Sequence, residues 1–141
     1  MDCICHNGFG GSGDVLHIDL KMKIEPLSQD NIKRAVNLLN QIFVADKDLI
    51  DSPANAFHAS LHPEEDEEFY KTHGLKTLYY FVVKDDDTSE VIGTTGLYTR
   101  IKDSKDVVWL GWYCVVPTYR GKGLGKELLS WTINKAKQEG F

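Results

Sequence analysis

The stretch VVPTYRGKGLGK spans residues 115–126 and lies between an apolar run and an amphipathic run. Glycine allows a main chain to adopt positive φ and to bring its amide groups close to a ligand. The first N–H groups of a following helix lack intrahelical partners and carry the positive end of the helix dipole. Three glycines interleaved with three cations at this place therefore indicate an anion site of the kind that holds a phosphate. Its residues are Arg120, Gly121, Lys122, Gly123, Leu124, Gly125 and Lys126.

Two well-known phosphate loops fit this stretch poorly. A Walker A loop requires G-x-x-x-x-G-K-[ST], whereas Arg120 stands at its first position and Glu127 follows Lys126. A dinucleotide-binding loop needs its third glycine one residue later. The run at residues 8–13 does spell G-x-G-x-x-G, but no strand-like segment precedes it and a strand-like segment follows it. We therefore reject residues 8–13 as a nucleotide site.

Hydrophobic periodicity on both sides of the loop predicts the remaining elements. The predicted strands are 15–27, 77–84, 90–99 and 107–116, and the predicted helices are 29–44, 63–73 and a last one ending near residue 139. Residues 45–62 give no clear pattern. The order β-α-α-β-β-β-α predicts a mixed α/β (α+β) domain over residues 15–141, preceded by a flexible glycine-rich leader at 1–14.

Composition narrows the function classes. The chain has 141 residues, a formal net charge of −5, 42% hydrophobic residues and three cysteines. A net acidic balance disfavours nucleic acid as a partner and favours a cationic one. The longest nearly unbroken apolar run has ten residues, whereas a membrane span needs about 20, so no membrane partner is expected. The odd cysteine count and the absence of a recognisable secretory leader favour a cytoplasmic location.

At the loop, the sequence resembles the GNAT N-acetyltransferase superfamily. The family's Q/R-x-x-G-x-G/A pattern is matched by Arg120, Gly123 and Gly125, after a strand that ends in Val115-Val116-Pro117. The element order matches as well, so the resemblance covers about residues 20–141. It implies that acetyl-CoA is the cosubstrate, with its pyrophosphate on the amides of residues 121–126. It also implies that the pantetheine arm pairs with the main chain near Val115, flanked by Cys114 and Val116.

The resemblance also implies what should follow. In the family a further strand, a helix and a hairpin come after the last predicted helix, so the chain resembles a member that is incomplete beyond Phe141. The strand ending at Val116 is then expected to present an uncovered apolar edge, through which the chain could self-associate. Members that use a strand glutamate as general base place it near Leu110, but residues 107–116 contain no acidic residue. No catalytic side chain is assigned.

The resemblance implies acetyl transfer from acetyl-CoA to a primary amine of a small molecule or peptide, by direct attack of the amine. The alternatives are a catalytically incomplete GNAT-like module that binds CoA or a partner, and an unrelated phosphate-binding protein. Which amine is used is left open. The acidic run at residues 64–68 is a candidate acceptor-binding segment, although charge runs of this kind are more often a solvated helix face. Four aromatic residues could line an acceptor pocket or simply pack the sheet: Tyr98, Trp109, Trp112 and Tyr113.

Neither histidine nor cysteine spacing predicts a metal. His58 and His62 are four residues apart, but the sequence lacks the Glu beside His58 that an H-E-x-x-H motif requires. Cys3, Cys5 and His6 look like half of a zinc site for which no second half follows. We therefore expect no metal.

Overall fold

The computed structural model describes residues 4–5, 22–43 and 52–141. The strands are β1 (Ile4–Cys5), β2 (Met22–Pro26), β3 (Leu75–Asp85), β4 (Val91–Arg100), β5 (Trp109–Leu110) and β6 (Tyr113–Val115). The helices are α1 (Ile32–Ile42), α2 (Pro53–Leu61), α3 (Glu67–His73) and α4 (Leu124–Gln138), with a 3₁₀ turn, η4 (Pro117–Tyr119), before α4. None of these helices is long and apolar enough to cross a membrane.

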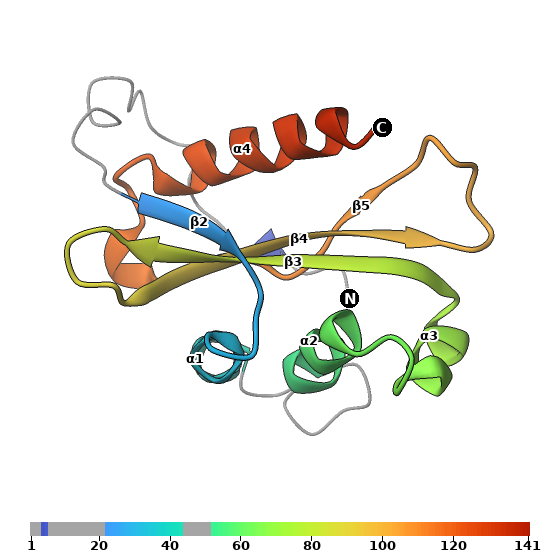
Figure 1. Cartoon of the computed structure of the whole chain (residues 1–141). Coiled ribbons are helices and arrows are strands. Elements are labelled where there is room, and N and C mark those ends of the chain that lie inside the picture. The colour runs from blue at the N-terminus through green and yellow to red at the C-terminus, as the bar shows by residue number, and fades with distance from the viewer. Residues whose placement is uncertain (1–3, 6–21, 44–51) are drawn as a thin grey trace.

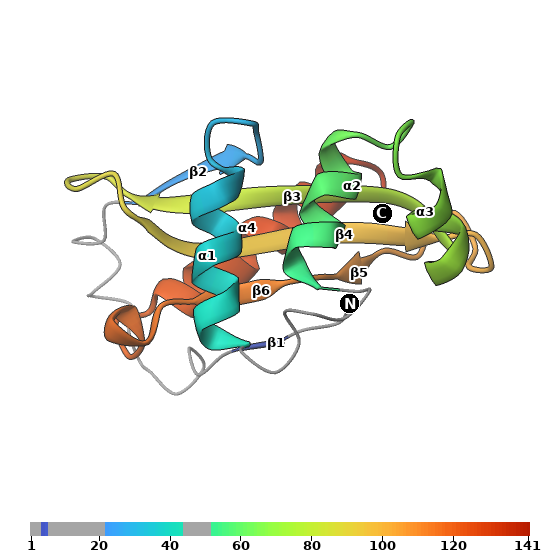
Figure 2. The same ribbon diagram turned by 90° about the horizontal axis from the view of Figure 1, so that it is seen from below.

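A mixed sheet forms the centre of the molecule, with strand order β1-β6-β4-β3-β2 and β5 paired to β4. The β1–β6 pair is parallel and the other pairs are antiparallel. Helices α1, α2 and α3 cover one face of the sheet and α4 covers the other (Figures 1 and 2). The mixed α/β class predicted from the sequence is confirmed.

Each face of the sheet has its own hydrophobic core. On the α1–α3 side, Leu39, Phe57 and Tyr80 are among the buried residues, and the rings of Phe57 and Tyr80 lie 4.7 Å apart. On the α4 side, Leu124 and Leu128 pack against the strand that precedes the glycine loop. The buried stripe of α4 is therefore what fixes the loop against the sheet.

The structure contains one helix that the sequence did not predict, and one predicted helix begins later than expected. Residues 52–62, which gave no pattern, contain α2: Ser52 caps it by accepting from the Asn55 N–H, and Pro53 occupies its first turn. The helix predicted to begin at Pro63 begins instead at Glu67. The N–H groups of Glu65 and Asp66 both donate to the His62 carbonyl, so the chain makes a turn there. Of the strand predicted at 15–27, the described part is β2, and the rest lies outside the described residues.

The single strand predicted over 107–116 is wrong. Leu110 pairs with Leu97 and Cys114 with Thr94, so this segment advances four residues while β4 advances three. The extra residue makes a β-bulge between β5 and β6. Trp112 takes a left-handed φ of 46° there, and its carbonyl accepts from the Thr94 hydroxyl at 2.6 Å.

The expectation of an uncovered edge on the strand ending at Val116 is also wrong at Tyr113 and Cys114. Ile4 pairs with Tyr113 and Cys5 with Cys114, on the side of β6 away from β4. The partner strand comes from within the segment predicted as a leader. Self-association through this part of the edge therefore loses its basis.

Candidate functional site

The loop between β6 and α4 is built from a 3₁₀ turn and two left-handed glycines. Pro117 begins the turn, Arg120 follows it in extended conformation, and Gly121 and Gly123 have φ of 83° and 82°. Other residues adopt such φ values only at a cost of about 1–2 kcal/mol. Both glycines are thus required by the backbone, as the sequence pattern predicted.

The N-terminus of α4 opens toward this loop. Gly123 is its N-cap and supplies no side-chain hydrogen bond, and the Glu127 N–H donates to the Gly123 carbonyl at 3.0 Å. Amides earlier in a helix's first turn have no acceptor within the helix. Lys122 and Lys126 are exposed at this end, and the Lys122 ammonium lies 5.2 Å from the Tyr119 ring centre. The arrangement is suited to an anionic group.

Two tyrosines fasten the loop to the sheet, and sequence reasoning gave neither of them this role. The buried Tyr113 hydroxyl donates to the Gly125 carbonyl, and the Tyr119 hydroxyl donates to an Asp85 carboxylate oxygen. Asp85 also accepts from the Asp87 N–H at 2.8 Å, so it closes the β3–β4 hairpin at the same time. The Tyr119 hydrogen bond, followed by that N–H, lowers the pKa of Asp85. The same contact raises the pKa of Tyr119.

The strand residues named from the sequence lie beside the loop. Cys114 and Val115 are buried and Val116 is half-buried, with the Val116 N–H donating to the Ile92 carbonyl at 2.8 Å. Arg120 folds back so that its Nε donates to the Val115 carbonyl at 3.3 Å. The structure thus brings the ten predicted cofactor-binding residues together over β6 and the start of α4.

The four aromatic candidates do not form one pocket. Tyr98 and Trp112 are buried on the α1–α3 side, where Trp112 packs edge-on against Phe43 with ring centres 5.7 Å apart. Tyr113 is buried on the other side of the sheet, in the core under α4.

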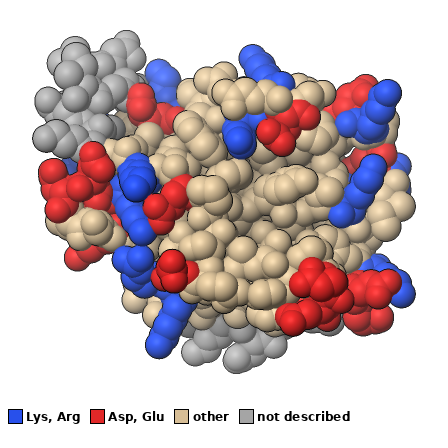
Figure 3. Space-filling view, in the orientation of Figure 1, with Lys and Arg blue, Asp and Glu red and all other residues tan. Residues whose placement is uncertain are grey.

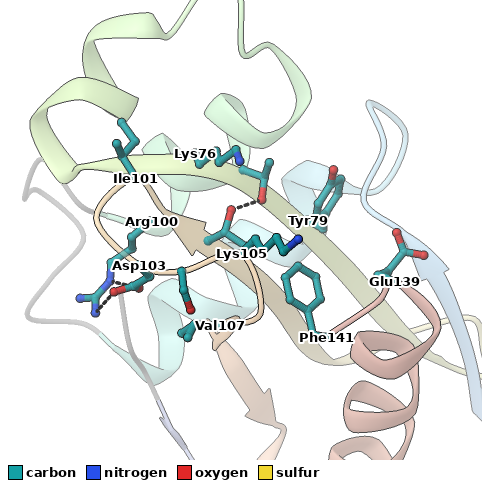
Figure 4. Close-up of a pocket in the computed structure, with 12 residues that line it drawn as sticks. Lys76, Tyr79, Arg100, Ile101, Asp103, Lys105, Val107, Glu139 and Phe141 are labelled. Atoms are coloured by element: carbon teal, nitrogen blue, oxygen red, sulfur yellow. Dashed lines mark hydrogen bonds and ion pairs between the residues drawn. The ribbon is translucent and has the colours of Figure 1, made fainter.

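Trp109 stacks on Tyr98 with ring centres 6.3 Å apart and is also held by an ion-pair cluster. Its indole N–H donates to Asp103 at 2.7 Å, and the Arg100 guanidinium lies 4.0 Å from its ring centre. Arg100 pairs with Asp103 and lowers the pKa of that carboxyl. Arg100 and Asp103 also border a groove of about 390 Å³ between β3, β4 and the end of the described chain (Figure 4).

The acidic run from residue 64 to 68 lies at the α2–α3 connection, which is separate from the loop (Figures 1 and 3). Only Glu67 and Glu68 belong to the first turn of α3. Glu65 instead lies beside the two histidines, with its Oε2 3.9 Å from His58 Nε2 and 3.7 Å from His62 Nδ1. The H-E-x-x-H pattern does not detect this cluster, because the carboxylate comes after the second histidine instead of between the two.

A family model for the GNAT acetyltransferases matches residues 46–141, which include the loop, β6 and α4. The chain belongs to the GNAT acetyltransferase family. As a GNAT protein it has β6, the glycine loop and α4 in the order that the sequence resemblance implied.

Solved structures share the GNAT fold with this chain at low sequence identity. An aminoglycoside acetyltransferase from an uncultured soil metagenomic sample is 19% identical, with a TM-score of 0.56 over 88% of this chain and 75% of that one. Glucosamine-6-phosphate N-acetyltransferase from Arabidopsis thaliana is 17% identical, with a TM-score of 0.55 over 85% and 77%. A GNAT-family N-acetyltransferase from Escherichia coli, solved with CoA, is 19% identical, with a TM-score of 0.55 over 86% and 59%. No curated protein sequence matches the chain significantly.

Proposed function

We propose that this protein transfers an acetyl group from acetyl-CoA to a primary amine of a small molecule or peptide. The observation that carries the proposal is the open N-terminus of α4, which two left-handed glycines place directly after β6. Backbone amides at a helix N-terminus bind phosphate oxygens well, and exposed Lys122 and Lys126 add positive charge to an otherwise acidic chain. The pyrophosphate of acetyl-CoA is the ligand proposed for residues 121–126.

The pantetheine arm is proposed to run along β6 at Cys114, Val115 and Val116. Because β1 pairs with this edge at Tyr113 and Cys114, the arm would have to displace β1 at Cys114. The Val115 carbonyl is the acceptor that one of its amides would meet, and Arg120 Nε now donates to that carbonyl. An amide of the arm would therefore share this carbonyl with Arg120 or displace it, one residue before the loop glycines.

Acetyl transfer to an amine makes three demands on the site. A lysine-like amine must lose a proton that costs about 4–5 kcal/mol to remove at neutral pH. A base or a water chain must accept that proton. Fixed N–H donors must stabilise the tetrahedral oxyanion, and the main chain of β6 near Val115 is the proposed donor.

A catalytically incomplete CoA-binding module is the second candidate. The observation that favours it is that residues 107–116, which include β5 and β6, contain no carboxylate to act as base. In this case the loop binds CoA, but no amine accelerates thioester cleavage.

Both candidate functions require the glycine loop to bind acetyl-CoA, and a binding measurement tests this requirement. Acetyl-CoA is titrated calorimetrically into the wild-type protein, Gly121→Glu and Gly140→Glu. Both glycines have positive φ, 83° and 98°, and a Cβ on either would meet no atom within 4 Å. The two variants therefore carry equal charge and similar backbone strain at opposite ends of α4. We expect binding to be lost only in Gly121→Glu; equal affinity in all three proteins would contradict the loop assignment.

Turnover separates the two candidates. Release of CoA thiol from acetyl-CoA is followed with and without a panel of primary amines that includes aminoglycosides, polyamines and peptides. Amine-dependent release identifies a transferase. Tight acetyl-CoA binding with no amine-dependent release across the panel favours the binding module.

A further inference from the structure

A cluster of nitrogen and oxygen donors lies on the α1–α3 side of the sheet, away from the cofactor loop. His58 is on α2, His62 is its C-cap, and Glu65 is in the following turn. One donor atom from each of the three lies within 4.8 Å of the others. We propose that these three side chains bind a divalent transition-metal ion of the zinc class. The proposal is independent of acetyl transfer.

The donor separations suit a metal after a small adjustment. Zn²⁺ bonds imidazole nitrogen and carboxylate oxygen at about 2.0–2.2 Å, so tetrahedral ligand atoms lie about 3.3 Å apart. Glu65 Oε2 is 3.7 Å from His62 Nδ1 and 3.9 Å from His58 Nε2. The Glu65 side chain is largely exposed, so its carboxylate can close this difference by rotation. The two imidazole nitrogens lie within 4.8 Å of each other and must also approach, by rotation of the exposed His58 ring. A fourth position would be left for water.

Each imidazole has a polar partner at the nitrogen that does not face Glu65. His58 Nδ1 contacts the Asp66 carboxylate, which accepts a hydrogen bond from Nδ1–H and so leaves Nε2 without a proton. His62 Nε2 contacts the side-chain amide of Gln29. The structure places the Gln29 amide nitrogen at this contact, so metal binding by His62 Nδ1 requires the Gln29 amide to turn by 180°, after which its oxygen accepts the Nε2–H. Such outer partners are typical of histidines that ligate metals.

At this location a bound ion would connect segments that are separate in the sequence. Gln29 belongs to the turn before α1, while the proposed ligands lie on α2 and the α2–α3 connection. The ion would therefore link three neighbouring segments on one face of the sheet. Imidazole with carboxylate is a donor set that suits zinc, nickel and copper better than calcium or magnesium. This proposal replaces the expectation of no metal, which rested on spacing that did not include Glu65.

The test is a titration of the metal-free full chain with Zn²⁺, followed calorimetrically. Glu65→Gln is matched by Glu64→Gln, which removes an equal charge one residue away. His58→Gln and His62→Gln are matched by His73→Gln, whose ring contacts the Phe69 carbonyl instead. We expect one strong site, an affinity loss of about tenfold or more in each of the three ligand variants, and little change in the two matched variants. Circular dichroism checks that every variant is folded.

Cobalt identifies which donors are used. Co²⁺ bound by His58, His62 and Glu65 gives visible bands with no thiolate charge-transfer band. Retention of a strong site in the His58→Gln/His62→Gln double variant overturns the proposal. So does a thiolate band that disappears in Cys3→Ser/Cys5→Ser, since the ion is then bound by the N-terminal cysteines. Equal weakening in Glu64→Gln and Glu65→Gln also overturns it, because general attraction by the acidic run would then suffice.

Discussion

Replacing Gly93 by alanine should displace β6 and thereby weaken cofactor binding. A Cβ at Gly93 would lie 2.6 Å from the backbone oxygen of Cys114, whereas ordinary contact begins near 3.4 Å. The two strands must therefore separate by about 0.8 Å, at the position where Gly93 pairs with Val115. Overpacking of this kind costs about 1–3 kcal/mol of unfolding free energy. A displacement approaching 1 Å in the strand proposed to hold pantetheine can also reduce turnover by about a hundredfold.

Urea denaturation followed by circular dichroism measures the stability of Gly93→Ala, and calorimetry measures its affinity for acetyl-CoA. Gly111→Ala is the control, because its Cβ would meet the edge of the Tyr98 ring at 3.0 Å and no backbone oxygen. A ring can shift by a few tenths of an ångström, so the control should lose less stability. If Gly93→Ala matches the wild type in both measurements, β4 does not set the position of β6 and the reasoning fails.

Three further predictions concern contacts away from Gly93. Tyr119→Phe should lower hydrogen-exchange protection in residues 117–123 at neutral pH. In the wild type that protection should persist from neutral pH down to the ordinary carboxyl pKa of 3.8 and fall only below it, because the lowered pKa of Asp85 preserves the contact until the carboxylate is protonated. Burial, with Asp66 nearby, raises the pKa of Tyr70 to about 12, so unfolding free energy should fall by about 1–2 kcal/mol as pH rises from 10 to 12. Urea denaturation should show no such component in Tyr70→Phe. Deleting residues 1–5 uncovers β6 and should produce concentration-dependent association in sedimentation experiments; a strictly monomeric product would show that β1 does not protect the edge.

The fold could be predicted where one periodicity dominates. Alternation and Gly74 placed β3 and the end of α3 within a few residues, because a half-buried strand and a left-handed cap leave clear sequence marks. α2 was missed since its nine residues include a mixture of small, polar and apolar side chains with no clean stripe. The bulge at Trp112 was also missed. It depends on a tertiary contact to Thr94, which no local pattern of residues 107–116 reveals.

The candidate site also has features that the sequence predicts and features that it does not. A backbone that needs positive φ favours glycine, so Gly121 and Gly123 could be located from the sequence. Contacts between distant segments could not, and the Tyr119–Asp85 hydrogen bond joins residues 34 positions apart. The His58–His62–Glu65 cluster could not be located from the sequence for a similar reason: Glu65 reaches the histidines only because the chain turns after His62 instead of continuing as a helix. Motif spacings such as H-E-x-x-H assume a continuous helix, whereas Glu65 lies in the turn that follows the end of α2.

Three consecutive small residues on β4 explain how the loop is positioned. Gly93 allows the Cys114 carbonyl to approach, the Thr94 hydroxyl holds the bulge at Trp112, and the Thr95 hydroxyl meets that of Thr132 on α4 at 2.8 Å. β4 thus sets the position of the strand before the glycine loop and of the helix after it. α1, α2 and α3 lie on the opposite face of the sheet from α4, and Phe43, after α1, packs against Trp112 there. The bulge therefore depends on both faces of the sheet, whereas the Thr95–Thr132 contact belongs to the α4 side alone.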